Sequence, residues 1–235
     1  MDYNCPSRED TSYYLINMLK EIILLLTAAT VSAKLPKDLA AHPQMGWNSW
    51  NHYHFGINED VIKQSADAMV SSGLAALGYN YINVDDGWAD FFRDSNGYIV
   101  VNNKFPSGMK ALGDYIHSKD LKFGIYSDAG YLTCGFQAGS IYHEKQDVQN
   151  YTQWGVDYLK YDNCYHPIMS APDRYERMKE ALEQSERNFF FGICSWGYED
   201  TVSWAPKMAQ SWRTTQDIWD RWSSVVYNFK MNQKS

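Results

Sequence analysis

The stretch Val156-Asp157-Tyr158-Leu159-Lys160-Tyr161-Asp162 predicts a short β-strand, over residues 156–161, that is followed directly by an aspartate. Similar β-prone runs recur along the chain, and helical stretches separate them. The predicted strands cover residues 46–50, 79–85, 121–127, 156–161, 188–194 and 211–214. The predicted helices cover residues 59–72, 106–118, 146–154 and 172–187. Strands that alternate with helices predict an α/β fold with a parallel sheet.

Two parallel-sheet architectures compete for this pattern. A doubly wound sheet usually has a glycine-rich phosphate-binding turn after its first strand, whereas Gly73–Gly78 lies at a helix end and has no lysine after it. A (β/α)8 TIM barrel instead gathers its chemistry at the carboxyl ends of its strands. Five acidic residues follow predicted strands: Asp85, Asp86, Asp128, Asp162 and Asp217. We therefore favour a barrel over residues 34–235, incomplete because only about six βα units fit.

The first 33 residues have the pattern of a secretory signal peptide. A short apolar run over residues 22–29 follows Lys20 and Glu21, and Val31-Ser32-Ala33 offers a cleavage site. The run is too short to cross a bilayer of ~30 Å, so no membrane is expected as a partner of the mature chain. Residues 1–17 are polar, and Met18 is a better start; a helix packed on the domain is the alternative.

Secretion predicts an oxidising compartment and a destination outside the cell, in the wall, or in a vacuole or lysosome. The leader contains Cys5, so Cys134, Cys164 and Cys194 remain, which predicts one disulfide and one buried thiol. Asn150 begins an Asn-Tyr-Thr sequon for N-glycosylation.

The composition narrows the class of partner. The chain has 21 Lys and Arg against 28 Asp and Glu, a net charge of −7, and no block of basic residues, which argues against nucleic acid. Hydrophobic residues make up 45% and predict a globular chain. Aromatic residues make up 16%, including nine Trp, which suits stacking on a flat ligand face. We find no pattern that indicates an oligomer.

The acidic residues at the strand ends could serve three purposes. Binding of Mg²⁺ or Ca²⁺ needs several converging oxygens, and the Lys and Arg neighbours of these residues would compete with a cation. The six His show no ligand spacing, so we predict neither a metal site nor a cofactor.

The second possibility is a glycosidase with two carboxyl groups. Lys160 and Asp162 share one face of a strand, and the lysine charge would keep Asp162 ionised as a nucleophile requires. Asp217 lies among tryptophans in the sequence, and apolar surroundings would raise the pKa of a proton donor. The neighbouring tryptophans are Trp212, Trp219 and Trp222.

The third possibility is sugar binding. The adjacent carboxylates of Asp85 and Asp86 could accept hydrogen bonds from neighbouring hydroxyls, with Trp50, Trp88 or Trp196 stacked on the ring. The structural alternatives are helix capping or turn formation for a single Asp and core packing for a single Trp.

Five motifs carry a family resemblance. They are Met45–Asn51, Leu77–Trp88, Gly124–Gly130, Tyr158–Cys164 and Ser211–Ile218. In this order they resemble family 27 glycoside hydrolases, which are α-galactosidases (melibiases) and α-N-acetylgalactosaminidases, and the plant-type enzymes are most similar. The match runs from about residue 43 to 226 and covers nearly all of the predicted mature chain.

The resemblance implies a (β/α)8 barrel followed by a small antiparallel β domain. This domain and the last two barrel strands are missing from the sequence, which suggests a C-terminal truncation. The implied activity is a retaining exo-glycosidase that removes terminal α-linked galactose from oligosaccharides, galactomannans or glycolipids without a metal or cofactor. The alternatives are an α-N-acetylgalactosaminidase and an inactive truncated fragment that binds sugar.

The resemblance also implies roles for individual residues. Asp162 matches the nucleophile and Asp217 the acid/base, and retention requires their carboxyl groups ~5–5.5 Å apart. Asp85 and Asp86 match the residues that hold the 4- and 6-hydroxyls of galactose. Other matching positions contact the sugar: Trp50 and Trp196 as aromatic walls, and Tyr126, Lys160 and Arg213 through hydrogen bonds.

Two further assignments follow from the same resemblance. Cys134 and Cys164 match the active-site disulfide, which leaves Cys194 as the buried thiol. Ser195 stands where many family members have Glu or Asn to bind the 2-substituent of the sugar, so this position bears on the choice between galactose and N-acetylgalactosamine.

Overall fold

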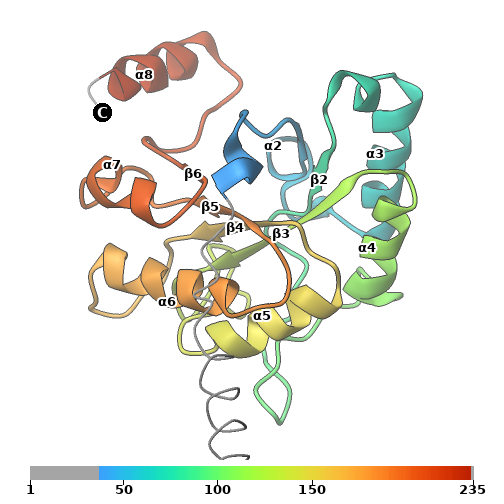
Figure 1. The fold of residues 1–235 in the computed structure, drawn as a ribbon, viewed down its shortest axis with the longest axis horizontal. Helices are drawn as coiled ribbons and strands as arrows, with labels where there is room; N and C mark the ends of the chain where they lie inside the picture. Colours follow the sequence, from blue (N-terminus) through green and yellow to red (C-terminus); the bar gives the residue numbers. More distant parts are fainter. Residues whose placement is uncertain (1–36, 234–235) are drawn as a thin grey trace, which may run out of the picture. The chain divides into compact units, whose positions relative to one another are not determined.

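The computed structural model describes residues 37–233 and contains one six-stranded parallel sheet (Figure 1). Each strand pairs with the next strand in the sequence, in the order β1 to β6. The strands are β1 (Gly46–Asn48), β2 (Tyr81–Asn83), β3 (Lys122–Asp128), β4 (Tyr158–Asp162), β5 (Phe190–Ile193) and β6 (Ser211–Trp212). All six predicted strands are confirmed, and their sequential parallel order is that of an incomplete (β/α)8 barrel. The predicted signal peptide over residues 1–33, with its alternative start at Met18, lies outside the described residues.

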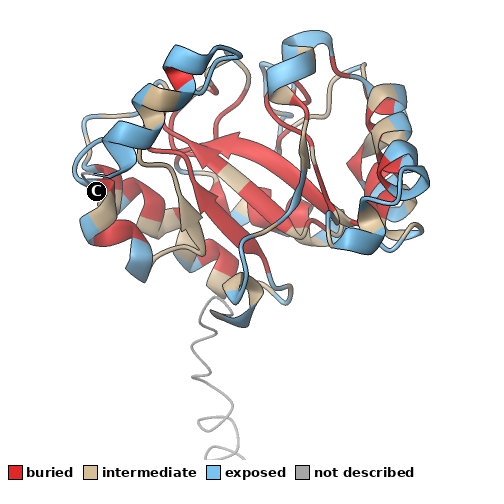
Figure 2. Cartoon of the chain, turned by 90° about the horizontal axis from the view of Figure 1, so that it is seen from above, coloured by how far each residue is buried: buried red, intermediate tan, exposed pale blue. Residues whose placement is uncertain are grey.

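The helices flank the sheet and leave the strands at the centre buried (Figures 1 and 2). The four predicted helices are present as α3 (Glu59–Ser71), α4 (Gly108–His117), α5 (Glu144–Gln153) and α6 (Ala171–Glu183). Three further helices were not predicted: α2 (Trp50–Tyr53), α7 (Thr201–Trp204) and α8 (Trp222–Asn232). Short 3-10 turns complete the set at η1 (Lys37–Ala40), η2 (His54–Gly56), η3 (Ala75–Leu77) and η4 (Ala205–Lys207). Within residues 37–233 no helix is both long and apolar enough to cross a membrane.

The strand register determines which side chains share the concave face. Successive side chains of a strand point to opposite faces. Tyr126 pairs with Lys160, and Asp128 pairs with Asp162, so these four lie on the same face of β3 and β4. Counting along β4, this face presents Tyr158, Lys160 and Asp162, whereas Leu159 and Tyr161 face the helices and are fully buried in the main core.

An aromatic layer closes the amino-terminal end of this concave face. Tyr81, Tyr158 and Phe190 form a separate buried cluster, and the rings of Tyr158 and Phe190 stack with centroids 5.4 Å apart. Gly124 lets β3 approach β2, because a Cβ there would lie 1.7 Å from Oδ1 of Asn83. The layer leaves the carboxyl end of the same face for polar side chains.

Candidate active site

The carboxyl ends of the strands bring most of the predicted residues together. The pleat places every second residue on the concave face, and the residues there become polar toward the carboxyl end of each strand. The polar residues at or just beyond these ends are Asn48, Asp85, Tyr126, Asp128, Lys160, Asp162, Cys194 and Arg213.

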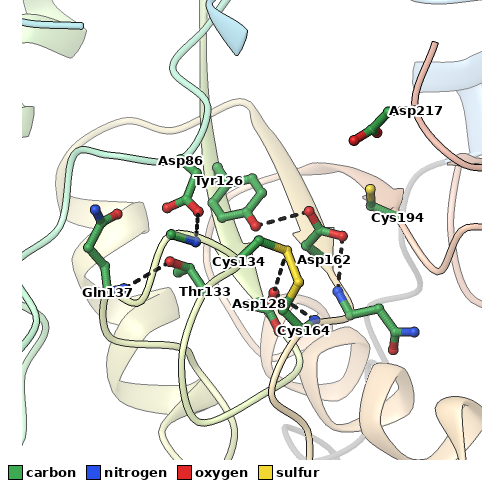
Figure 3. Close-up of a disulfide and its surroundings, with 12 residues drawn as sticks. Asp86, Tyr126, Asp128, Thr133, Cys134, Gln137, Asp162, Cys164, Cys194 and Asp217 are labelled. Carbon is green, nitrogen blue, oxygen red and sulfur yellow. Dashed lines mark hydrogen bonds between the residues drawn. A yellow bond between two sulfur atoms is a disulfide. The ribbon is translucent and has the colours of Figure 1, made fainter. Parts of the chain in front are cut away.

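Asp162 is buried, with a residue exposure of 6%, and its carboxylate is held by two donors. The hydroxyl of Tyr126 donates to Oδ2 at 2.9 Å, and the backbone N–H of Asn163 donates to Oδ1 at 3.0 Å (Figure 3). Burial raises the pKa of Asp162 above its ordinary value, and the charge of Lys160 and the hydrogen bonds from the Cys194 thiol and Tyr126 offset that rise only in part. Lys160 thus favours the ionised form of Asp162 as expected, but desolvation is the larger effect on this carboxyl group.

Lys160 pairs with Asp85 instead. Its Nζ lies 2.8 Å from Oδ2 of Asp85, and Nδ2 of Asn48 donates to the same oxygen at 2.8 Å. Burial is the largest single influence and lowers the pKa of Lys160, but Asp85, Cys194 and Asp162 together raise it more, so the net shift is upward. Ser49 accepts the backbone N–H of Asp85 at 3.0 Å. Asn48 and Ser49 were not predicted as partners of Asp85, although both lie in the Met45–Asn51 motif.

Asp86 is oriented by backbone groups. The N–H of Gly135 donates to Oδ2 at 2.7 Å, and the N–H of Gly87 donates to Oδ1 at 2.9 Å. Burial, with a smaller contribution from the negative charge of Asp85, raises the pKa of Asp86 to about 6, against the lowering effect of the hydrogen bonds from Gly135 and Thr133. The two adjacent carboxylates therefore have different partners, and both are buried.

Asp217 lies beyond β6 and contacts Arg213. Nη1 of Arg213 donates to Oδ1 of Asp217 at 2.8 Å, and the Asp217 side chain is 54% exposed. Trp219 and Trp222 are exposed as well, so the predicted apolar surroundings of Asp217 are wrong. The physical reason is local: the segment from residue 216 to 223 is an exposed loop and helix start, so tryptophans that are neighbours in sequence do not enclose the carboxyl group.

A cavity of about 350 Å³ lies against Lys160 and Asp217, whereas Asp85, Asp86, Tyr126 and Asp162 are not among the residues that line it. Trp50, Lys160, Arg213 and Asp217 line it, so four predicted residues from three separate segments meet in one space. The Trp50 ring is itself oriented edge-on against His54, at a centroid distance of 5.2 Å. A cavity of this size accepts a small molecule and has both cationic and anionic groups on its wall.

Three further predicted contact residues also lie outside this cavity. Trp88 is buried, and its Nε1 donates to the carbonyl of Tyr126 at 2.9 Å, so the expectation that it could stack on a sugar is wrong. Ser195 is fully buried, and its hydroxyl lies 2.6 Å from that of Thr201. Trp196 is half-buried at φ 58° and packs edge-on against Tyr198. Ser195 and Trp196 do not line the cavity of about 350 Å³.

Cys134 and Cys164 form a disulfide beside Asp162, and Cys194 is a buried free thiol (Figure 3). Asp128 also belongs to this group, although the sequence analysis gave it no role: its Oδ2 accepts the N–H of Cys164 at 3.0 Å. Burial and the nearby Asp162 raise the pKa of Asp128 well above its ordinary value. Its position at a strand end was the signal that could have identified it.

One cluster of acidic and sulfur side chains and the predicted glycosylation sequon are distinct from the predicted sugar-contact positions. Within residues 37–233, one group of acidic and sulfur side chains is close enough to share an ion, namely Asp128, Cys134 and Cys164. Both sulfurs of that group are bonded to each other, so they offer no thiolate. Asn150 lies on α5 and is half-buried, next to the fully buried Tyr151.

A comparison with known protein families shows which family the chain belongs to. The family model described as alpha galactosidase A matches residues 42–235. The chain belongs to this melibiase family. It is 55% identical over 198 residues to alpha-galactosidase 2 of Arabidopsis thaliana, a match that covers 83% of this chain and 50% of the relative. The chain spans about half the length of the curated relatives it matches.

Solved structures of α-galactosidases have the same fold. Alpha-galactosidase I from Mortierella vinacea matches with a TM-score of 0.77 and 42% identity, over 79% of this chain and 48% of that one. An α-galactosidase from Saccharomyces cerevisiae, solved with raffinose, matches with a TM-score of 0.76 and 37% identity, over 80% of this chain and 43% of that one. The predicted barrel fold and family are therefore confirmed.

Proposed function

We propose that this protein acts as a retaining exo-glycosidase on terminal α-linked galactose in oligosaccharides, galactomannans or glycolipids. The observation that carries the proposal is the cavity lined by Trp50, Lys160, Arg213 and Asp217 at the carboxyl ends of the strands. Family membership supports galactose as the sugar, and the Saccharomyces cerevisiae enzyme solved with raffinose supports an α-galactoside substrate.

The proposed reaction uses two carboxyl groups and water. A carboxylate oxygen of Asp162 attacks the anomeric carbon, the glycosidic bond breaks, and Asp217 gives a proton to the leaving oxygen. Water then attacks the same carbon, Asp217 takes the proton from this water, and Asp162 is released. The two bonds that hold the Asp162 carboxylate fix its orientation for the attack.

Binding of the sugar follows from the remaining groups. Asp85 and Asp86 would accept the 4- and 6-hydroxyls, and their orientation is set by Lys160 and by the N–H of Gly135. In this proposal Tyr126 and Arg213 contact the sugar as well, and Trp50 and Trp196 form the aromatic walls. Ser195 would face the 2-substituent, and its hydroxyl lies 2.6 Å from that of Thr201.

The secretory assignments are part of the same proposal. Residues 1–33 would direct the chain into the secretory pathway, where the Cys134–Cys164 bond would form. The mature enzyme would act outside the cell, in the wall, or in a vacuole or lysosome. The half-buried Asn150 would be glycosylated there only where its side chain becomes accessible.

Hydrolysis of an aryl α-galactoside, followed by proton NMR, tests the proposal. The expected first product is α-galactose, because two displacements at the anomeric carbon retain its configuration. An aryl α-N-acetylgalactosaminide assayed in parallel should react more slowly. Release of β-galactose, or faster cleavage of the N-acetylated substrate, would overturn the mechanism or the substrate respectively.

A further inference from the structure

The loop from Thr133 to Gln137 is a small closed unit. The backbone N–H of Thr133 donates to the carbonyl of Gln137 at 2.8 Å, and the N–H of Phe136 donates back to the carbonyl of Thr133 at 2.9 Å. The N–H of Gln137 also donates to the Thr133 hydroxyl at 3.0 Å. These bonds hold the loop in one shape, so its position depends on how it is attached to the rest of the protein.

One covalent bond attaches this loop to the catalytic strand β4. Cys134 lies in the loop, and its disulfide partner Cys164 lies two residues after Asp162. Asp128 at the end of β3 strengthens the attachment, because its carboxylate accepts the N–H of Cys164 at 3.0 Å. Asp128 is fully buried, which fixes this bond inside the protein. The loop is thus held against β3 and β4 together.

The loop places one backbone donor on Asp86. Gly135, directly after Cys134, gives its N–H to Oδ2 of Asp86 at 2.7 Å. The contact leaves no space for a side chain: a Cβ on Gly135 would lie 2.9 Å from Oδ2 of Asp86 and 2.3 Å from Cε1 of Phe55. The Phe55 ring is 43% exposed and could turn away, but Asp86 would still be too close. Position 135 therefore requires glycine for a steric reason.

We propose that the Cys134–Cys164 disulfide acts through Gly135 as the positioning device for Asp86. This inference rests on the proposed function, in which Asp86 accepts a sugar hydroxyl. The N–H of Gly87 donates to Oδ1 and the N–H of Gly135 donates to Oδ2. Because each carboxylate oxygen of Asp86 accepts one of these bonds, the orientation of the carboxylate plane is fixed. The free lone pairs of the two oxygens then have defined directions for a bound hydroxyl.

The electrostatic surroundings make the Gly135 bond measurable. Asp86 is near three other acidic groups, Asp85 on its own segment and Tyr126 and Asp128 on β3. Burial and, to a smaller extent, the repulsion from Asp85 raise the pKa of Asp86, whereas the bonds from Gly135 and from the Thr133 side chain of the same loop lower it. Loss of this bond therefore predicts a further rise in the pKa of Asp86, an effect that simple loosening elsewhere in the fold would not produce.

The experiment compares the titration of Asp86 in folded variants of the full chain. The side-chain carboxyl carbons of Asp are labelled with ¹³C, and the Asp86 signal is assigned by its absence in Asp86→Asn. The variants are Gly135→Ala and the pair Cys134→Ser with Cys164→Ser. The matched control is Gly56→Ala, because a Cβ on Gly56 meets nothing within 4 Å. If the double serine variant does not fold, wild-type protein reduced with a phosphine after folding replaces it.

The expected result is a higher Asp86 pKa than in wild type for Gly135→Ala and for the protein without the disulfide, and no change for Gly56→Ala. Titration at the wild-type pKa in both altered proteins would overturn the inference. Calorimetric binding of galactose to the wild-type chain reports separately on the proposed function. A shifted titration without galactose binding would keep the positioning role and reject the sugar-binding role of Asp86.

Discussion

The buried ion pair between Lys160 and Asp85 gives the sharpest test of how the site is held together. The Lys160 side chain is 19% exposed and that of Asp85 is 2% exposed, and their charged atoms are 2.8 Å apart. Removing one partner of a buried pair leaves an uncompensated charge, which costs about 3–5 kcal/mol. Asp85 keeps the donor from Asn48, so we expect Lys160→Met to lower the free energy of unfolding by about 3 kcal/mol.

The assay is urea unfolding at pH 7, followed by circular dichroism. The matched control is Lys110→Met, because Lys110 pairs with Asp114 at the surface, where both side chains are 59% exposed. An exposed pair of this kind contributes about 0.5 kcal/mol or less. In a domain of this size the Lys160 variant should also melt roughly 6–12 °C lower. Equal losses for the two variants would refute the view that Lys160 neutralises a buried carboxylate.

Three other predictions concern stability. The first concerns Asp86, whose pKa is about 6 in the folded protein and near 3.8 in the unfolded chain, so its contribution to stability is complete below pH 3.8 and is lost as the pH rises through 6. Because Asn does not titrate, the free energy of unfolding of Asp86→Asn, measured relative to wild type in urea titrations, should increase by about 3 kcal/mol between pH 3.5 and 7.5. A difference between the two proteins that stays constant over this pH range would contradict the prediction. Asn58→Ala removes the side chain that caps α3 and should cost about 1 kcal/mol in the same assay, and an unchanged midpoint would exclude a capping role. Gly124→Ala should lower the melting temperature far more than Gly56→Ala, because only the first Cβ meets another side chain, and equal melting temperatures would count against the close approach of β3 to β2.

The strands and main helices could be predicted because their signals are local. Runs of β-prone residues such as Tyr158–Asp162, and an amphipathic segment such as Glu59–Ser71, specify their structure within a few residues. The helix Trp222–Asn232 was missed, because only Ser224 is buried in it and it therefore has no apolar period that marks a buried face.

The sequence predicted which residues belong to the candidate site better than it predicted the contacts between them. Asp162 and Asp85 stand at the carboxyl ends of strands that the sequence marks clearly. Because parallel strands end at the same edge of a sheet, both residues could be predicted to lie at that edge. The partner of Lys160 did not follow, because β2 and β4 are separated by β3 and only the curvature of the sheet brings Asp85 within reach. The surroundings of Asp217 were wrong for a related reason: neighbours along an irregular loop do not share a direction.

Covalent trapping on Asp162 is the most direct measurement of the central claim. The chain is incubated with an activated fluorinated α-galactoside, digested, and examined by mass spectrometry, with Asp162→Ala as the control. The account predicts one fluorogalactosyl adduct on the peptide that contains Asp162, and none on the control. An adduct that persists in Asp162→Ala, or that is found on a peptide without Asp162, would contradict it.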